Sequence, residues 1–567
     1  MKRYAWFGAR TLVCVLLASG ALFAQPAAPT FSHDVAPIIY QNCAICHHTG
    51  GSGPFPLITY QEVKKHARQI AAVTRSRYMP PWLPAPGYGD FMGERRLTRA
   101  QIDTIAAWVR AGAPEGNPAE SPVPPQFNSE WQLGPPDLVL KASQPFTVPP
   151  DGPNLFWNFV FKPNIQATRY VRAVEIRPGK SNLIHHANLI VDRIGSSLRH
   201  SHSLAGFPGM DVRVDRSVFD PISHFLFWKP GTVPYSEPDG LSWRLDPGNY
   251  LILNTHLQPS GKPEEVQPEI GLYFTDQPPA KFPIVIELED DDALDIPPGV
   301  RDFLARDDFR LPVDADLLAI YPHAHYLGKR LEAYATLPSG KRQWLLLIPN
   351  WDFNWQAVYR YRRPVFLPKG SVISMRFHYD NSSANPRNPN HPPKRVHAGN
   401  QATDEMAHLW LQILPRGEGD HRRPVQEALM RHEIEKHPND FEAHMNLGAL
   451  LLSRLDAQGA ASELEAAIRL EPERAEPHDM LGIAFENLGR FADALEQYRI
   501  AVRNDPSYLN AHYDLARALA RRGDFEEAIR HLKIVAAAYP DNPGLQKQLH
   551  ALLAAGQGRK PARGQHE

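Results

Sequence analysis

The sequence has no excess of charge of either sign, and after its N-terminus it has no long apolar run. It contains 61 basic and 62 acidic residues, for a formal net charge of −1. A near-neutral chain gives no electrostatic reason to expect nucleic-acid binding. No later stretch reaches the roughly 18 consecutive apolar residues that would span a membrane. The mature chain is therefore predicted to bind no nucleic acid and to contain no membrane span.

The sequence is also poor in cysteine, with three in 567 residues. One of them, Cys14, lies in an apolar run that follows a basic start and precedes a plausible cleavage site near Ala24. These features predict a secretory signal peptide over residues 1–24. Only Cys43 and Cys46 then remain, so the exported chain has no disulfide framework. Its domains must depend on their cores and, we expect, on metals.

Length and composition indicate several folded domains. A chain of 567 residues is too long for one core, and three or four domains are expected. Proline is abundant, at 55 residues, while charged residues make up only 22% and hydrophobic residues 43%. This mixture is typical of β-rich domains with many loops and not of disorder.

The segment 43-CAICHH-48 contains Cys-x-x-Cys-His, the attachment pattern of c-type haem. Cys43 and Cys46 are predicted to form thioether bonds to one covalently attached haem c, and His47 to be the proximal iron ligand. A redox-active or zinc-binding Cys-x-x-Cys is the alternative. It is disfavoured because the chain has no second cysteine pair and because c-type haem is assembled in the exported compartment.

The second axial ligand of the haem is predicted to be Met79, because adjacent prolines restrict its loop. Met92 is the alternative. A helix is expected over residues 97–116, with Thr98 near its N-cap. Its apolar positions at helical spacing are Ile102, Ile105, Ala106 and Val109. Residues 31–120 resemble a small, all-α class I cytochrome c.

The C-terminal part of the sequence is repetitive. From about residue 425 the composition shifts to Ala, Leu, Glu and Arg, and a regular repeat begins. The positions in phase are Pro438, Pro472, Pro506 and Pro540; Leu447, Leu481 and Leu515; and Gly448, Gly482 and Ala516. This spacing is typical of tetratricopeptide repeats, which stack into an α-solenoid. Residues 425–555 are predicted to be such repeats. Their concave surface is expected to bind a protein partner or, alternatively, to pack only on its own chain.

Between the haem segment and the repeats, short alternating segments are separated by Pro, Gly, Asn and Asp. Examples are 170-YVRAVEIRP-178, 249-NYLILNTHLQP-259, 316-DLLAIYPHAHYLG-328 and 371-SVISMRFHYD-380. Alternation of this kind predicts antiparallel β-sandwiches. The length favours two of them, over residues 130–285 and 286–416.

Three histidine groups stand out in these strands. His185 and His186 are adjacent, so their side chains reach one point only through a twist, a bulge or a strand end. His256 closes an apolar strand. His323 and His325 are two residues apart, so on a strand both would face one side, which suits a metal. None of these groups alone establishes a metal site.

The segment 402-ATDEMAHLWLQ-412 completes an ordered set of motifs. Together with the three histidine groups it resembles the copper type II ascorbate-dependent monooxygenases, the family of the peptidylglycine α-hydroxylating and dopamine β-monooxygenases. The resemblance covers half of the chain and implies two jelly-roll-like β-sandwiches, each with one copper ion. The implied ligands are His185, His186 and His256 for an electron-transfer copper, and His323, His325 and Met406, the implied catalytic residues, for an O₂-activating copper. Imidazole and thioether ligands suit copper better than magnesium, and the thioether argues against zinc.

The sequence departs from the family where peptide-amidating members hold the carboxylate of their substrate. An Arg before the His-x-His pair, and an Asn and a Tyr after the Met, are replaced here by Tyr321, His408 and Trp410. Without the bidentate Arg clamp, a peptide ending in glycine is not expected as substrate. The aromatic side chains indicate a small apolar or aromatic substrate, and these three residues are its predicted contacts.

Hydroxylation by such a copper pair consumes two electrons: R–H + O₂ + 2e⁻ + 2H⁺ gives R–OH + H₂O. The relatives take these electrons from ascorbate. Here the haem domain is expected to deliver them, replacing or supplementing ascorbate, and to be reduced by an external donor. The chain is predicted to lie in a bacterial periplasm. One alternative is a non-enzymatic haem and copper scaffold that docks through its repeats. Another, zinc-dependent hydrolysis, lacks a recognisable carboxylate base.

Overall fold

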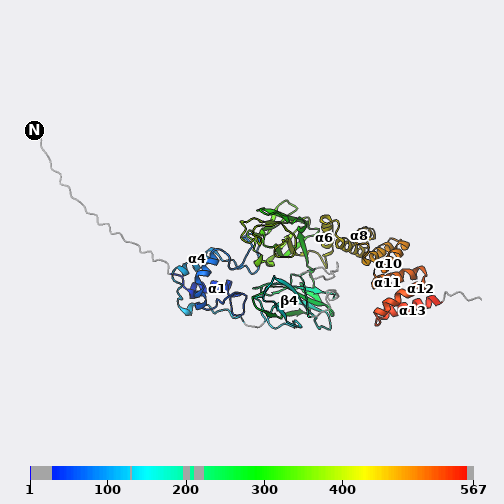
Figure 1. Ribbon diagram of the computed structural model, residues 1–567, viewed down its shortest axis with the longest axis horizontal. Helices are drawn as coiled ribbons and strands as arrows, with labels where there is room; N and C mark the ends of the chain where they lie inside the picture. Colours follow the sequence, from blue (N-terminus) through cyan, green and yellow to red (C-terminus); the bar gives the residue numbers. More distant parts are fainter. Residues whose placement is uncertain (2–27, 128–130, 194, 196–204, 210–221, 558–567) are drawn as a thin grey trace, which may run out of the picture. The chain divides into compact units, whose positions relative to one another are not determined.

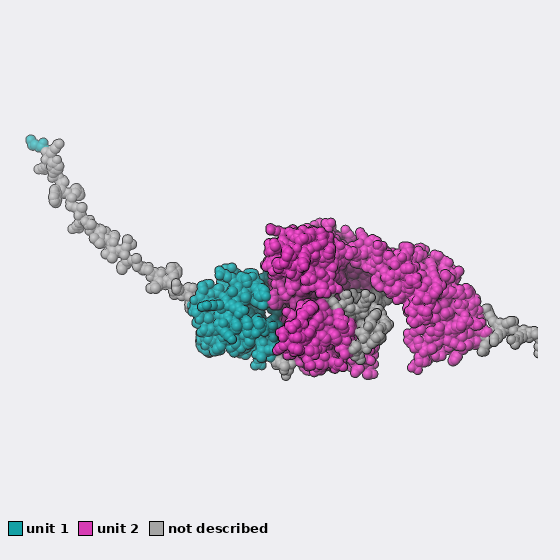
Figure 2. All heavy atoms as spheres, viewed as in Figure 1, with its two compact units in different colours: residues 1–80, 95–127 teal, residues 81–94, 128–567 magenta. Residues whose placement is uncertain are grey.

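The structure is a computed structural model that describes residues 1, 28–127, 131–193, 195, 205–209 and 222–557. The chain divides into two compact units (Figure 2). The N-terminal unit contains Met1–Pro80 and Arg95–Phe127, and the large unit contains Pro81–Glu94 and Asn128–Glu567. The predicted signal peptide lies, apart from Met1, outside the described residues.

The N-terminal unit is helical. Its elements are η1 (Phe31–Val35), α1 (Ala36–Asn42), α2 (Tyr60–Lys65), α3 (Ala67–Arg75), α4 (Arg99–Arg110) and η2 (Pro118–Glu120). The expected helix is present as α4, and Thr98 caps it by accepting a hydrogen bond from the backbone N–H of Gln101. The buried face of α4 includes Ile102 and Ile105, as expected, but Trp108 is fully buried whereas Ala106 and Val109 are only partly buried. The bulkier ring takes the core position.

The first part of the large unit, residues 138–275, contains two five-stranded antiparallel sheets. One holds β1 (Leu138–Lys141), β12 (Glu269–Thr275), β4 (Arg169–Arg177), β8 (Tyr235–Ser236) and β9 (Trp243–Leu245). The other holds β6 (Phe207–Pro208), β3 (Leu155–Phe161), β10 (Tyr250–Leu257), β5 (Ile184–Asp192) and β7 (Phe227–Trp228). A short pair, β2 (Phe146–Val148) and β11 (Glu264–Val266), accompanies them. Both five-stranded sheets contribute to one apolar core, so we call them the first sheet pair.

The second sheet pair, residues 284–415, contains two four-stranded antiparallel sheets that share another core. One holds β13 (Ile284–Glu289), β22 (His408–Pro415), β16 (Ala315–His323) and β19 (Tyr359–Leu367). The other holds β15 (Phe303–Arg310), β20 (Val372–Tyr379), β17 (Gly328–Thr336) and β18 (Arg342–Ile348). The pair β14 (Asp295–Ile296) and β21 (Val396–His397) and the short helices η3 (Asp291–Ala293) and η4 (Phe353–Trp355) complete it. The four segments predicted from alternation overlap β4, β10, β16 and β20, but the third, 316–328, runs past the end of β16 at His323.

The C-terminal part consists of consecutive helices, drawn in yellow to red in Figure 1. They are α6 (Arg423–Lys436), α7 (Phe441–Ser453), α8 (Ala457–Leu470), α9 (Ala475–Asn487), α10 (Phe491–Asn504), α11 (Leu509–Arg522), α12 (Phe525–Ala538) and α13 (Pro543–Gln557). Each periodic proline stands two residues beyond a helix end, where it cannot extend the helix. The carbonyl of Pro472, for example, accepts a hydrogen bond from His478 Nε2 at 3.1 Å. The predicted helical repeat is thereby confirmed. Within the described residues, no helix is both long and apolar enough to cross a membrane.

Candidate functional site

A β-bulge brings the two adjacent histidines of the first sheet pair together. Strands β5 and β10 are neighbours, and His186 lies opposite His256, but the next pair along is Ile184 and Leu257. His185 is therefore the extra residue of a bulge, which breaks the alternation of side chains between the two faces. Of the three arrangements that the sequence allows, the bulge is the one present. The three histidines form what we call the three-histidine group.

The three imidazole rings of this group surround one point. Their centroids are 5.3 Å apart for His185 and His186, 5.2 Å for His185 and His256, and 5.1 Å for His186 and His256. Each ring offers a nitrogen within 4.8 Å of those of the other two. The Nδ1 atoms of His185 and His186 are 3.1 Å apart. The buried Nδ1 of His256 has no hydrogen-bond partner among the described residues.

This geometry fits a metal ion better than a hydrogen-bonded histidine cluster. A buried polar atom without a partner is costly, and a cation accepts the nitrogen lone pairs that no protein donor uses. Burial lowers the pKa of His185 to about 4 and that of His256 to about 3, and holds the pKa of His186 well below its ordinary value. All three imidazoles are thus neutral near pH 7, the form that ligates metals.

The second histidine pair meets by a different route from the one expected. Strand β16 ends at His323, and His325 lies in the turn that leads to β17, so the two do not share a strand face. Their ring centroids are nevertheless 5.2 Å apart. His323 Nδ1 donates to Gln356 Oε1 at 2.7 Å, and His325 Nδ1 donates to the carbonyl of Asp404 at 3.1 Å. Both rings are thereby left with Nε2 as the free ligand atom.

A buried carboxylate holds this turn against the segment that contains Met406. Glu405 is fully buried and accepts hydrogen bonds from the backbone N–H of His325 at 2.7 Å and of Leu327 at 2.6 Å. Burial raises its pKa to about 8, although these bonds favour the carboxylate. Met406 follows directly and is partly buried, and its carbonyl accepts a hydrogen bond from Tyr379 at 2.7 Å. Its sulfur remains a predicted ligand.

One aromatic ring contacts both histidine groups. The centroid of Phe353, on η4, is 5.4 Å from that of His185, 6.1 Å from that of His323 and 5.3 Å from that of His325. Phe353 is 5% exposed. The three-histidine group and the His323–His325 pair therefore contact the same side chain, although they belong to different sheet pairs and are far apart in the sequence.

The predicted substrate contacts form an aromatic wall beside His323. The rings of Tyr321 and Trp410 stack with centroids 5.3 Å apart and an interplanar angle of 18°. Phe227, from the first sheet pair, adds a ring 5.2 Å from Tyr321. His408 uses both ring nitrogens on carboxylates, at 2.6 Å to Glu287 and 2.8 Å to Asp291. Only its ring faces remain for contact with a substrate.

Sequence reasoning missed Gln356, Phe353 and Phe227, and it gave Glu405 no role. Glu405 had a signal, because it adjoins Met406 in the motif that carries the resemblance. Gln356 and Phe353 had none: they lie in a segment without periodicity, beyond the two strands that follow His323, and only the fold places them beside it.

The Cys-x-x-Cys-His segment is arranged as an axial histidine requires. Cys43 and Cys46 are both free thiols and partly buried. His47 Nδ1 donates to the carbonyl of Phe55 at 2.9 Å, which leaves Nε2 for a metal. Met79 belongs to the same compact unit, whereas Met92 belongs to the large unit, where its N–H donates to the carbonyl of Arg360 at 2.8 Å.

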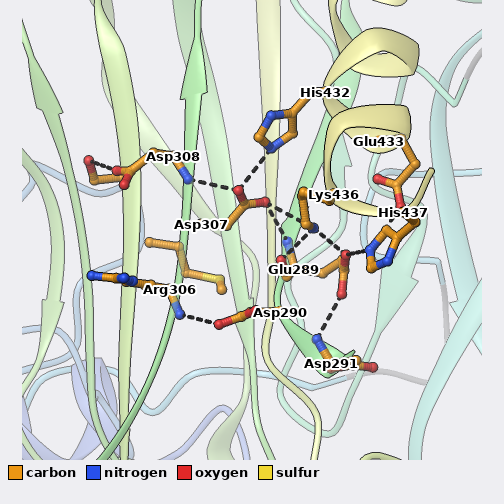
Figure 3. Close-up of polar contacts among 12 residues, drawn as sticks. Glu289, Asp290, Asp291, Arg306, Asp307, Asp308, His432, Glu433, Lys436 and His437 are labelled. Carbon is orange, nitrogen blue, oxygen red and sulfur yellow. Dashed lines mark hydrogen bonds and ion pairs between the residues drawn. The ribbon is translucent and has the colours of Figure 1, made fainter. Parts of the chain in front are cut away.

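A further group of possible metal ligands joins the second sheet pair to α6 (Figure 3). It consists of Glu289, Glu433 and His437, whose ligand atoms lie within 4.8 Å of one another. Lys436 already provides a positive charge there, in contact with Glu289 and 3.4 Å from Asp307. The group is therefore a network of ion pairs that fastens α6 to β13 and β15.

Comparisons with known proteins identify the repeats. The tetratricopeptide repeat family matches residues 480–543. No curated protein matches the chain. Among solved structures, two crystal structures of MamA are similar to part of it. The first is 18% identical, with a TM-score of 0.23, and the match covers 24% of this chain and 75% of the MamA chain. The second is 20% identical, with a TM-score of 0.23, and the match covers 25% of this chain and 86% of the MamA chain.

Proposed function

We propose that the chain is an exported copper-dependent monooxygenase that hydroxylates a C–H bond of a small apolar or aromatic substrate with O₂. The observation that carries the proposal is the pair of histidine groups that both contact Phe353. One group offers three neutral imidazoles around one point, and the other offers two with Nε2 free. Copper bound at these groups would supply one-electron transfer and activation of O₂.

The residues around the proposed sites hold and orient the ligands. The bulge in β5 directs His185 and His186 toward His256. Gln356 fixes the tautomer of His323, and the carbonyl of Asp404 fixes that of His325. Glu405 holds the turn that contains His325 against the segment that contains Met406. Tyr321 and Trp410 would bind the substrate by its flat or apolar face. No Arg clamp for a carboxylate stands beside His323 in the sequence.

We further propose that the N-terminal unit is a cytochrome c that feeds electrons to the three-histidine site. Cys43 and Cys46 would hold one haem c covalently, with His47 and Met79 as axial ligands. The hydrogen bond from His47 Nδ1 to the carbonyl of Phe55, at 2.9 Å, orients Nε2 for this purpose. An axial methionine favours a haem that exchanges single electrons.

The proposal is tested by metal and haem analysis of protein exported in a strain that matures c-type haem, followed by oxygenation assays. We expect two copper ions and one haem per chain. We also expect ¹⁸O from labelled O₂ to enter one of a panel of small apolar compounds. Met406→Ala should abolish incorporation, whereas Met430→Ala, at a partly buried methionine of α6, should preserve it.

Two results would contradict the proposal. Two bound coppers with no O₂ consumption under ascorbate or a haem reductant would favour the scaffold that docks through its repeats. Tight selection for peptides ending in glycine would refute the substrate class while leaving the chemistry in place. His397→Ala removes an exposed histidine that pairs with Asp295, and it controls for effects that removal of any histidine would have.

A further inference from the structure

The tetratricopeptide repeats contain a pocket whose lining includes a buried carboxyl group with one oxygen that lacks a hydrogen-bond partner among the described residues. The pocket has a volume of about 630 Å³ and is lined by α9, α11, α12 and α13 and the turns that precede α11 and α13. Most of it falls within residues 480–543, which match the repeat family. None of the proposed copper ligands lines this pocket, so a ligand could bind there whether or not the chain binds copper.

Asp479, on α9, is the unusual residue of this pocket. The residue is 3% exposed, and its Oδ1 has no hydrogen-bond partner among the described residues. Burial, reinforced by repulsion from Asp514, raises its pKa to about 8. A buried acceptor left without a donor destabilises the fold. The fold tolerates this cost at a position that lines an open pocket.

The neighbouring arginines are engaged mainly by other carboxylates. Arg517 donates to Asp514 at 3.0 Å and to Glu486 at 3.1 Å, so its guanidinium is already shared between two carboxylates. Arg521 donates to Glu486 at 3.0 Å and is itself 53% exposed. Asp479 receives a side-chain hydrogen bond from Tyr508 and lies in the field of Arg517, but these do not offset its burial, and its Oδ1 keeps no hydrogen-bond partner among the described residues.

The walls of the pocket combine aromatic and apolar side chains with polar ones. Tyr508, Tyr513 and Tyr539 line it, and Tyr539 is 53% exposed. Gln548 of α13 donates to the hydroxyl of Tyr513 at 3.3 Å, which ties two walls together. Aromatic walls above a carboxylate suit a long side chain with an aliphatic stem and a cationic end, because the stem packs on the rings and the charge reaches the acid.

We propose that this pocket receives a lysine or arginine side chain from an extended segment of a partner protein, with its cationic group at Asp479 Oδ1 and its stem between the tyrosines. The partner is thus recognised by a basic residue flanked by apolar ones. The concave surface of a repeat solenoid is suited to such an extended segment. Charge complementarity selects a basic segment over an acidic one.

Selection of phage-displayed random nonapeptides on the full-length protein tests the proposal. We expect the selected peptides to share a Lys or Arg at one position beside apolar residues. Replacement of that residue by norleucine in the synthetic peptide should weaken binding at least tenfold, and exchange of Lys for Arg shows which cation fits better. Selection of acidic peptides, or of peptides without a common basic residue, would overturn it.

Matched variants assign the binding to the pocket. Asp479→Asn keeps the size of the side chain and removes its charge, so it should weaken binding of the selected peptide at least tenfold. Asp541→Asn, at an exposed carboxylate two residues from Tyr539, should leave binding unchanged. Equal effects of the two variants would refute the site. Thermal unfolding of both variants controls for folding.

A pH series on the unaltered protein gives a second readout that needs no variant. A cation pairs with the carboxylate form of Asp479, so below pH 8 a proton must leave when the peptide binds. Affinity should therefore rise between pH 6.5 and pH 9, where a peptide lysine stays charged. The groups that act on Asp479 are Asp514, Arg517 and Tyr508, and Tyr508 has its pKa raised to about 12. A flat profile, or one that falls over this range, would contradict the proposal.

Discussion

At the scale of single residues, Gln356 orients one member of the second histidine pair, His323. Its Oε1 accepts from both Tyr321, at 2.8 Å, and His323 Nδ1, at 2.7 Å, and it is 1% exposed. Gln356→Leu removes the acceptor that fixes the ring of His323. Loss of such an outer partner typically costs about 10- to 100-fold in metal affinity. We expect copper titration to show this loss at one of two sites.

Gln356→Glu is the matched variant, because it keeps an acceptor at the same place. It should retain copper affinity within about threefold of the unaltered protein, since a carboxylate also holds Nδ1–H in place. If the Leu and Glu variants at position 356 lower copper affinity equally, the hydrogen bond to His323 is not what orients its ring.

Phe353 supports both histidine groups at once. Replacement of a buried phenylalanine by alanine costs about 3–5 kcal/mol, because contacts are lost and a cavity remains. Phe353→Ala should therefore lower the unfolding temperature of the large unit and the copper affinity of both histidine groups. The measurements are calorimetry and copper titration. Phe353→Leu should be milder, and Phe366→Ala, at a side chain 41% exposed, should change copper affinity little. Loss at one group alone would show that Phe353 supports only that group.

At the scale of secondary-structure elements, the attachment of α6 to the second sheet pair depends on pH. Burial raises the pKa of Glu289, but hydrogen bonds from Lys436, the N–H of Asp291 and His437 outweigh it and hold the pKa at about 2. This contribution to stability is present above the ordinary glutamate pKa of 4.5 and is lost as pH falls toward 2. Burial lowers the pKa of His437, but its carboxylate partners raise it overall, so its contribution is lost as pH rises above 6.5.

The attachment of α6 should therefore be strongest between about pH 4.5 and pH 6.5. Hydrogen-exchange protection factors of the α6 amides at pH 3, 5.5 and 8 measure it. Lys436→Met should reduce protection at pH 5.5 about tenfold, since it leaves Glu289 and Asp307 without their shared cation. Lys533→Met, at an exposed lysine of α12, should have no effect. Equal protection at the three pH values would contradict the prediction.

Regular strands and helical repeats could be predicted from the sequence, whereas local breaks in the strands could not. Strands and repeats were predictable because alternation and a fixed repeat period are local patterns that burial imposes on consecutive residues. The bulge at His185 was predictable only as one of three choices, because two adjacent ligands require some break in alternation. The turn at His325 was not predictable, since a His-x-His spacing is equally compatible with a continuous strand. Its geometry depends on Glu405, 80 residues away.

At the scale of the whole molecule, the chain joins a proposed haem unit and proposed copper sites covalently. A short tether gives an effective concentration in the millimolar range, far above that of dilute protein. We expect the reoxidation of chemically reduced haem by O₂ and substrate to follow a first-order rate constant that stays the same from about 0.1 to about 10 μM protein, well below the tether's effective concentration. Stopped-flow absorbance measures it. His256→Ala, which removes one of three ligands, should slow the reaction at every concentration, and His397→Ala should not. A rate constant proportional to protein concentration would show that the electrons pass between molecules, and the fusion would then serve another purpose.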